Sequence, residues 1–345
     1  MKNLFVMHTQ YNLILSAGIL SRYRDAHNTL VLFSEFSLTD EMLGAISRIF
    51  DKVIIVRDHY EPHKRMCDDI KEIRGCLKAV RGIMNERYDN IFMSQERTFD
   101  MILCRWVKRK NRKAVCHHVE EDVYYSIQNR YNAIGYVPKE SVKTKIKKLI
   151  YAIVFLKYPY KFWETSYCYG MSSEYDVVNL LFPEFARREI SGKKLFQITK
   201  EELQTGVKQL YAHIDFDYPK SNKYAIFFFD LMSRYKNPEL ARKILEKQIE
   251  TANKEGRCVL FKYHPRETSK FNNVKGGLEI PSILPAEKIL FDFLGHDVVV
   301  VGNATTSCIV AAKFGFNVKS ICKIDAPTNA RMQEVMQNMG IICLE

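Results

Sequence analysis

Three short polar segments each follow an apolar, strand-like run, and each carries side chains that can do acid–base or anion-binding chemistry. The first, Glu120-Glu121-Asp122, follows the run Ala114–Val119. Adjacent carboxylates repel one another, so one of them can have a raised pKa and act as a general base. The same residues would also suit the acidic first turn of a following helix, which the helix dipole favours. On this segment alone both interpretations stay open.

The second segment is His264-Pro265, which closes the apolar run Cys258–Tyr263. A histidine fixed by a following proline, beside Lys262 and Arg266, has the chemistry to protonate or hydrogen-bond a phosphate. An ordinary histidine ahead of a turn-forming proline would give the same pattern. This segment therefore predicts a phosphate contact only in combination with others.

The third segment runs from Gly302 to Ser307 and follows the four valines Val298–Val301. Its residues Thr305, Thr306 and Ser307 open a predicted helix, where backbone N–H groups and hydroxyls can hold an anion. The alternative is a plain Ser/Thr helix cap with no ligand.

The elements that must position these segments alternate between strand and helix. In the first half, apolar runs such as Lys52–Val56 alternate with amphipathic stretches such as Cys67–Glu86. The alternation stops near Pro138 and restarts with the strand-like Lys223–Asp230. Such alternation predicts parallel sheets covered by helices. We expect an α/β protein, and the natural candidate is the GT-B class, in which two Rossmann-like β/α domains face a central cleft. Other two-domain α/β proteins would give the same pattern. The predicted boundaries are 1–165, an inter-domain segment 166–219, and 220–345.

Composition narrows the classes of function. The 345 residues are 47% hydrophobic, and 52 Lys and Arg against 40 Asp and Glu give a net charge of +12. This balance favours an anionic partner, which could be a nucleic acid, an acidic membrane or a negatively charged substrate. Nine scattered cysteines without a C-x-x-C spacing indicate reduced thiols and no zinc site. Without an export signal or an apolar run of about 20 residues, we expect a cytoplasmic protein.

Two further stretches bear on ligands. Asp215-Phe216-Asp217 has the D-x-D pattern of metal-dependent glycosyltransferases, but it lies in the inter-domain segment, so we interpret it as an exposed linker feature. In residues 143–163, lysines precede the apolar run Leu149–Leu156, and four aromatics at 158, 160, 162 and 163 follow it. That composition suits a helix lying on an anionic membrane. A helix packed on its own domain is the alternative.

In their order and spacing, the three segments resemble motifs of the bacterial GT-B sialyltransferases, particularly the capsule polysialyltransferases and glycosyltransferase family 52. Those enzymes carry an acidic pair, an H-P dipeptide and a Ser/Thr cluster after a late apolar strand. The segment Leu284-Pro285-Ala286-Glu287 and the opening His8-Thr9-Gln10-Tyr11-Asn12 are similar to the same group. The resemblance covers the first strand and residues 119–324. It departs from the pattern at Asp122, where the family has glycine.

The resemblance implies an inverting sialyltransferase that moves sialic acid from CMP-sialic acid to a sugar hydroxyl of a capsule or lipooligosaccharide. Glu121, or else Glu120, would be the base, and His264 would serve the leaving phosphate. The N-terminal domain would take the acceptor and the C-terminal domain the donor. His8, Thr9 and Gln10 would line the cleft. Donor-binding residues would be Lys262, Pro265, Glu287, Gly302, Thr305, Thr306 and Ser307.

No metal or cofactor is implied, because the leaving group is a single phosphodiester. We expect a nucleotide-sugar donor, a glycan acceptor, peripheral contact with the inner face of the cell membrane through residues 143–163, and no nucleic acid. Two alternatives remain: a GT-B enzyme using CMP-Kdo or a UDP-sugar, and a non-enzymatic basic protein that binds nucleic acid. No recognised nucleic-acid-binding motif supports the second.

Overall fold

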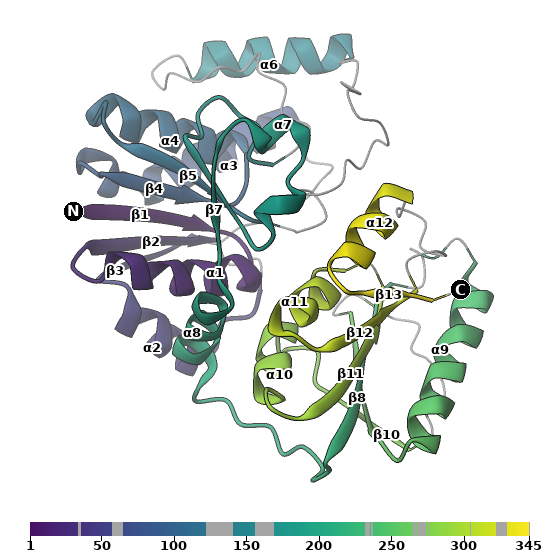
Figure 1. The fold of residues 1–345 in the computed structure, drawn as a ribbon. Helices are drawn as coiled ribbons and strands as arrows, with labels where there is room; N and C mark the ends of the chain where they lie inside the picture. Colours follow the sequence, from purple (N-terminus) through teal and green to yellow (C-terminus); the bar gives the residue numbers. More distant parts are fainter. Residues whose placement is uncertain are drawn as a thin grey trace. The chain divides into compact units, whose positions relative to one another are not determined.

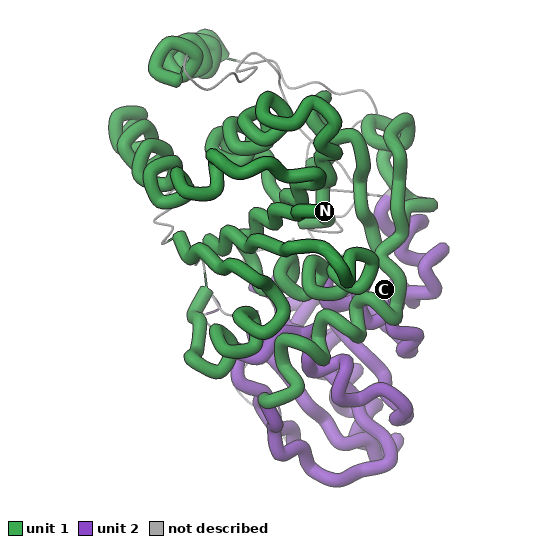
Figure 2. The backbone as a smooth tube through the Cα atoms, turned by 90° about the vertical axis from the view of Figure 1, so that its left-hand side faces the viewer, with its two compact units in different colours: residues 1–121, 133–213 green, residues 122–132, 214–345 purple. Residues whose placement is uncertain are grey.

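The computed structural model describes residues 1–33, 36–56, 65–121, 141–155, 169–231, 235, 237–264, 267, 274, 276–303, 305–321 and 330–344. These residues form two compact units, one holding the described residues up to 213 and the other those from 214 onward (Figures 1 and 2). Each unit is a parallel sheet with helices on both faces, as the alternation of strands and helices predicts.

The sheet of unit 1 has seven strands in the order β3-β2-β1-β4-β5-β6-β7, and all neighbours are parallel. The strands are β1 Lys2–Met7, β2 His27–Phe33, β3 Lys52–Val56, β4 Asn90–Met93, β5 Val115–Val119, β6 Val177–Leu180 and β7 Lys194–Gln197. The helices are α1 Gln10–Ile19, η1 Leu20–Tyr23, α2 Asp40–Ile49, α3 Met66–Ala79, η2 Ile83–Asn85, α4 Thr98–Lys110, α6 Val142–Val154, η3 Pro183–Phe185, α7 Arg188–Ser191 and α8 Lys200–Tyr211.

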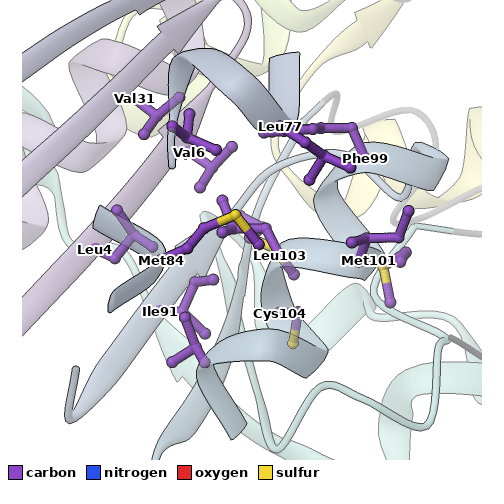
Figure 3. Close-up of a cluster of buried hydrophobic side chains, with 14 of the residues drawn as sticks. Leu4, Val6, Val31, Leu77, Met84, Ile91, Phe99, Met101, Leu103 and Cys104 are labelled. Atoms are coloured by element: carbon purple, nitrogen blue, oxygen red, sulfur yellow. The ribbon is translucent and has the colours of Figure 1, made fainter. Parts of the chain in front are cut away.

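Alternation of side chains along the strands divides the core of unit 1 between the two faces of its sheet. Leu4 and Val6 of β1 pack with residues of α3 and α4, among them Leu77 and Leu103, in the cluster shown in Figure 3. Phe5 points to the other face and stacks on Phe92, with ring centroids 4.4 Å apart.

The boundary of unit 1 differs from the predicted one. Residues 177–211 were expected in an inter-domain segment, but β6 and β7 extend the first sheet and α8 packs on α1. Two glycines allow the backbones of α1 and α8 to touch. A Cβ added at Gly18 would lie 2.2 Å from the carbonyl oxygen of Glu202, and one at Gly206 would lie 2.0 Å from that of Ile14. Any side chain at either position would push α8 away from the unit.

The sheet of unit 2 has six parallel strands in the order β10-β9-β8-β11-β12-β13. They are β8 Lys223–Phe229, β9 Cys258–Tyr263, β10 Gly277–Glu279, β11 Asp297–Gly302, β12 Asn317–Ser320 and β13 Ile342–Cys343. The helices are α9 Pro238–Lys254, α10 Ala286–Asp292, α11 Thr306–Phe314 and α12 Ala330–Asn338. One face of the sheet packs against α9, and α10 and α11 lie on the other (Figure 1).

Local signals in the sequence explain where several of these helices begin and end. Asn237 caps α9 ahead of Pro238, and the αL conformation of Gly315, with φ of 89°, ends α11. In the described part of the chain, no helix has both the length and the apolarity needed to cross a membrane.

Candidate functional site

Glu120 is the first residue after β5, and the fold of unit 1 encloses it. Its side chain is 1% exposed. One carboxylate oxygen accepts a hydrogen bond from the Tyr11 hydroxyl at 2.7 Å, and the other accepts one from the Leu181 amide at 3.1 Å. The Asn12 side chain also donates to the Glu120 carbonyl at 3.1 Å. The carboxylate of Glu120 thus joins α1 to the segment that follows β6.

Glu121 has a different environment from its neighbour. It is half-buried, and its Oε1 accepts a hydrogen bond from the Gln95 side chain at 2.8 Å. Gln95 follows β4, so the two adjacent glutamates contact different segments of unit 1. Asp122, the departure from the family pattern, lies outside the described residues. Glu121 is the more exposed residue of the two, although its Oε2 atom is itself buried.

The segment after β1 was expected to line a cleft, but its histidine is buried. His8 is 1% exposed, and its Nε2 lies 3.0 Å from the carboxylate of the fully buried Asp100. Its ring stacks on Phe33 at 4.3 Å between centroids. Thr9 caps α1 by accepting a hydrogen bond from the Asn12 amide, and Gln10 begins that helix. Thr9 and Gln10 are half-buried, so in this segment they are more accessible than His8.

Two histidines of β5 add to the buried polar groups of unit 1. Burial is the main reason that the pKa of His118 falls to about 3, with a smaller contribution from the Lys193 charge. Burial likewise lowers the pKa of His117 to about 4. Both imidazoles are therefore neutral at physiological pH, and they form part of the core.

In unit 2, His264 follows β9 directly. Its amide donates to the Phe229 carbonyl at 2.9 Å, and its own carbonyl accepts from the Glu267 amide at 2.9 Å. These bonds hold the residue against the end of β8 and leave it half-buried. Pro265, the second half of the H-P motif, lies outside the described residues.

Lys262 and Glu287 are both buried, on β9 and in the first turn of α10. Burial raises the pKa of Glu287, and the charge of Lys262 and a backbone hydrogen bond oppose that rise. Burial lowers the pKa of Lys262, and the charge of Glu287 opposes it. Each group therefore favours the charged form of the other, so the donor-site residues predicted at these two positions are electrostatically coupled.

The Ser/Thr segment stands at the start of α11. Thr305 is the N-cap, and its side chain makes no capping hydrogen bond, while Thr306 and Ser307 form the first turn. All three are half-buried. A glycine is required just before them, because a Cβ at Gly302 would lie 2.9 Å from Cys308 Sγ and 3.1 Å from the Phe228 carbonyl oxygen. The segment offers hydroxyls and the amides of a helix N-terminus to an anion.

Two buried polar side chains beside this segment lack hydrogen-bond partners among the described residues. Asn303 and Ser320 are both 0% exposed. Neither the amide group of Asn303 nor the hydroxyl of Ser320 makes a hydrogen bond within the described part of the protein. Asn303 follows β11, and Ser320 is the last residue of β12. The two strands are neighbours, because Gly302 of β11 pairs with Ser320. Unpartnered buried groups are uncommon and mark a place where a polar ligand or water can be accommodated.

The topology of unit 2 brings these residues to the same end of the sheet. His264 follows β9, buried Asp230 follows β8, and Asn303 follows β11. Because β8 lies between β9 and β11, the ends of the outer two are about 10 Å apart. Open α/β sheets bind ligands outside the carboxyl ends of their strands. This end of unit 2 has the donors and the spacing for a phosphate-containing ligand.

Sequence reasoning missed several of these residues. Asn303 lies inside the segment Gly302–Ser307, and Tyr11 and Asn12 lie inside the opening motif, but the motifs do not single out any of the three as a site residue. Gln95 follows the short strand β4, and Ser320 ends the short strand β12. Neither residue belongs to a sequence motif that could have identified it. By contrast, the D-x-D carboxylates of Asp215 and Asp217 are exposed and precede β8. The described residues include no group of three His, Cys, Asp or Glu side chains placed to hold a metal ion.

No protein-family model matches the sequence, and no curated protein matches it. Solved structures do share its fold. UDP-GlcNAc 2-epimerase from Methanocaldococcus jannaschii is similar over 100% of this chain and 89% of its own, with a TM-score of 0.53 and 12% identity. UDP-GlcNAc 2-epimerase from Neisseria meningitidis, solved bound to UDP-GlcNAc, is similar over 99% of this chain and 87% of its own, with a TM-score of 0.52 and 12% identity.

Phytolacca americana UGT2, solved with UDP-2-fluoro-glucose and pterostilbene, is similar over 100% of this chain and 86% of its own, with a TM-score of 0.50 and 11% identity. At such identities these matches establish the fold alone. They confirm the predicted fold class, a GT-B protein built from two Rossmann-like β/α domains.

Proposed function

We propose that this protein is a metal-independent, inverting glycosyltransferase that moves sialic acid from CMP-sialic acid to a sugar hydroxyl of a bacterial surface glycan. The observation that carries the proposal is the placement of the family-like motifs. Glu120-Glu121, His264 and Thr305-Thr306-Ser307 all stand at carboxyl ends of parallel strands, on a GT-B fold. Two of the similar folds were solved with nucleotide sugars bound, which supports a nucleotide-sugar substrate.

In the proposed reaction, the oxygen of the acceptor hydroxyl attacks the anomeric carbon of sialic acid. Glu121 takes the proton from that hydroxyl. The bond from that carbon to the CMP phosphate oxygen breaks, and the anomeric centre inverts. His264 hydrogen-bonds or protonates the departing phosphate. Thr305, Thr306, Ser307 and the amides of α11 hold the anionic groups of the donor, beside Gly302, Pro265 and Lys262. Glu287 would order the ribose hydroxyls.

The unpartnered polar groups of unit 2 support a donor site at this end of its sheet. A buried amide without a partner costs about 1–3 kcal/mol, and a nucleotide bound beside Asn303 and Ser320 would recover part of that cost. The leaving group is a single phosphodiester, so the proposed reaction needs no metal to neutralise a diphosphate.

A donor panel tests this assignment. The protein is incubated separately with CMP-sialic acid, CMP-Kdo and UDP-GlcNAc, with galactosides and oligosialic acids as acceptors, and products are read by mass. We expect CMP release and a product heavier by one sialic acid, lost in Glu121→Gln. Transfer only from CMP-Kdo or a UDP-sugar would replace the donor in this proposal, and conversion of UDP-GlcNAc without an acceptor would indicate an epimerase.

We also propose that the protein works in the cytoplasm, in peripheral contact with the inner face of the cell membrane through α6. Four apolar side chains of this helix are strongly exposed: Val142 at 74%, Ile146 at 53%, Leu149 at 62% and Ile153 at 60%. Their spacings of four, three and four residues place them on one stripe of the helix. Lysines accompany the stripe, which suits an anionic lipid surface.

The other face of α6 fastens it to unit 1. Tyr151 and Phe155 belong to the core cluster, and Lys147 and Tyr151 both contact the carboxylate of Asp69, at 2.7 and 2.8 Å. Residues 156–163, also expected at the membrane, lie outside the described residues. Co-sedimentation with phosphatidylglycerol vesicles tests the contact. Ile146→Ser with Leu149→Ser should abolish it, and Ile283→Ser, at an exposed apolar residue of unit 2, should leave it unchanged.

A further inference from the structure

A basic cavity of about 450 Å³ lies in unit 1 where α3, η2 and α4 meet the end of α6. Its lining includes three cations, two aromatic rings and a valine: Arg74, Lys78, Arg81, Trp106, Val154 and Phe155. The volume is in the range of small-molecule sites. None of the residues assigned above to acid–base chemistry or donor binding lines it.

The charged side chains that line the described part of the cavity are all positive. Arg74 and Lys78 are one turn apart on α3, and Arg81 follows the end of that helix. Of the described residues that line the cavity, none is a carboxylate, and none of these three exposed cations forms an ion pair with another described residue. Neighbouring cations that lack a carboxylate partner repel one another, and a bound anion removes that repulsion. The cavity therefore suits a strongly anionic group such as a phosphate.

The remaining lining is apolar and held in place. The indole N–H of Trp106 donates to the Met84 carbonyl, and the Lys110 ammonium lies 5.9 Å from the centroid of its ring system. Phe155, Leu77 and Met84 belong to the core cluster of unit 1. A ligand that fills this space should carry an apolar portion as well as the anion.

The position of the cavity separates it from the candidate catalytic end of the sheet. Arg81 and η2 lie on the connection that leads into the amino end of β4, and Trp106 lies in the half of α4 that leads toward β5. The cavity is therefore near the opposite end of the strands from Glu120 and Glu121. A ligand here would anchor the protein and would not take part in the reaction.

We propose that this cavity binds the phosphate headgroup of an anionic lipid. The inference rests on the proposed membrane contact of α6, which selects a lipid over a free phosphate. Val154 and Phe155 of the cavity adjoin Ile153, the last residue of the exposed stripe. A lipid drawn from the membrane at α6 could thus place its phosphate among Arg74, Lys78 and Arg81, with its apolar portion against Trp106 and Phe155.

Trp106 reports on the cavity once the second of the two tryptophans is removed by Trp163→Phe. In that background, dihexanoyl phosphatidic acid, a soluble short-chain lipid, should change the Trp106 emission with a saturable titration curve. Arg74→Gln with Lys78→Gln should weaken binding at least tenfold. Lys243→Gln with Lys247→Gln is the matched control, since it removes two exposed cations with the same spacing from α9 of unit 2, and it should change the affinity less than twofold.

Further measurements distinguish a lipid phosphate from a free phosphate. They also test the cavity separately from the membrane contact of α6. Dihexanoyl phosphatidylcholine should bind at least tenfold more weakly, and inorganic phosphate should not compete at the same concentration. Equal competition by inorganic phosphate would assign the cavity to a free anion, and unaltered binding in Arg74→Gln/Lys78→Gln would remove the site. If the protein binds the short-chain lipid but no vesicles, the membrane contact of α6 fails and the cavity assignment stands.

Discussion

Glu120 in unit 1 and Asn303 in unit 2 occupy corresponding positions, each being the first residue after a buried parallel strand. Both are buried, at 1% and 0% exposure. The carboxylate of Glu120 accepts hydrogen bonds from Tyr11 and Leu181, which come from two other segments. The amide of Asn303 has no such partner among the described residues. At the end of β5, hydrogen bonds satisfy the buried carboxylate of Glu120. At the end of β11, the buried amide of Asn303 stays unsatisfied among the described residues.

This difference suggests a division of labour. A satisfied buried network rigidifies its surroundings, so Glu120 serves to fix the chain that presents Glu121. An unsatisfied buried amide lowers stability and is retained where it serves another purpose. In unit 1 the reacting group would be a half-buried side chain on a rigid support, whereas in unit 2 the ligand itself would complete the polar contacts.

The largest effect should come from the acidic pair. Glu121→Gln keeps the shape of the side chain but cannot accept a proton, so kcat for sialyl transfer should fall 10²- to 10⁴-fold, the usual range for a lost general base. CMP affinity, measured by calorimetry, should stay within a few-fold. Glu120→Gln is the internal control.

In Glu120→Gln, one amide oxygen can still accept from Leu181, and the Tyr11 hydroxyl can turn to accept from the new N–H. We expect a loss of about 1 kcal/mol of stability and a smaller loss of rate than in Glu121→Gln. The reverse order of rate losses would make Glu120 the base and remove the division of labour within the pair.

His264→Ala tests unit 2. If His264 serves the leaving phosphate, kcat should fall about 10²-fold or more, with little change in the thermal midpoint, because a half-buried residue after a strand adds little to the core. His296→Ala, at an exposed histidine of the same unit, should retain full activity. A well-folded and fully active His264→Ala would take this residue out of the site.

Acid should weaken unit 1 through His118. Its pKa in the folded chain is about 3, below the usual 6.5, so the unfolded chain binds the proton more readily between these values. Stability is therefore lost as pH falls from 6.5 toward 3. At 1.36 kcal/mol per pKa unit, the loss between pH 7 and pH 5 should be about 2 kcal/mol.

His118→Leu isolates this contribution in urea unfolding at both pH values. Neither ring nitrogen of His118 has a hydrogen-bond partner in the described part of the chain, so the variant should be at least as stable at pH 7. It should also lose about 2 kcal/mol less than the wild type on going to pH 5. An identical loss in both proteins would mean that His118 does not carry the acid sensitivity.

The smallest effect tests Asn303 directly. Asn303→Leu removes a buried amide without partners, so it should raise the free energy of unfolding by about 1 kcal/mol and weaken CMP binding about tenfold. Asn12→Leu is the counterpart in unit 1. It removes an amide bonded to the Glu120 carbonyl and should lower stability. If Asn303→Leu destabilises the protein as Asn12→Leu does, the contrast between the two strand ends disappears.

Local sequence pattern is enough to predict the strongly apolar elements. Lys52–Val56 and Cys258–Tyr263 are strands with the bounds that their apolar runs predict. Such elements follow from local periodicity, because a buried parallel strand must be apolar on both faces. The order of the three motif segments, each placed just after a strand, came from the same pattern.

Short and mixed elements were missed. The strands β6 and β7 have four residues each, too few for a periodicity to stand out. For α8 a signal was present, since Thr199 and Glu202 form a capping box. A capping box predicts that a helix begins, but it does not say which unit the helix joins.

Three features could be seen only in the folded protein: α8 belongs to unit 1, Glu120 is buried while Glu121 is more exposed, and the Asn303 amide has no partner among the described residues. Each of these depends on residues far apart in the chain. Gly18 meets Glu202, and Glu120 meets both Tyr11 and Leu181. Residue type sets which hydrogen bonds a side chain can make, but burial and the supply of partners depend on which distant segments the packed sheet brings beside it.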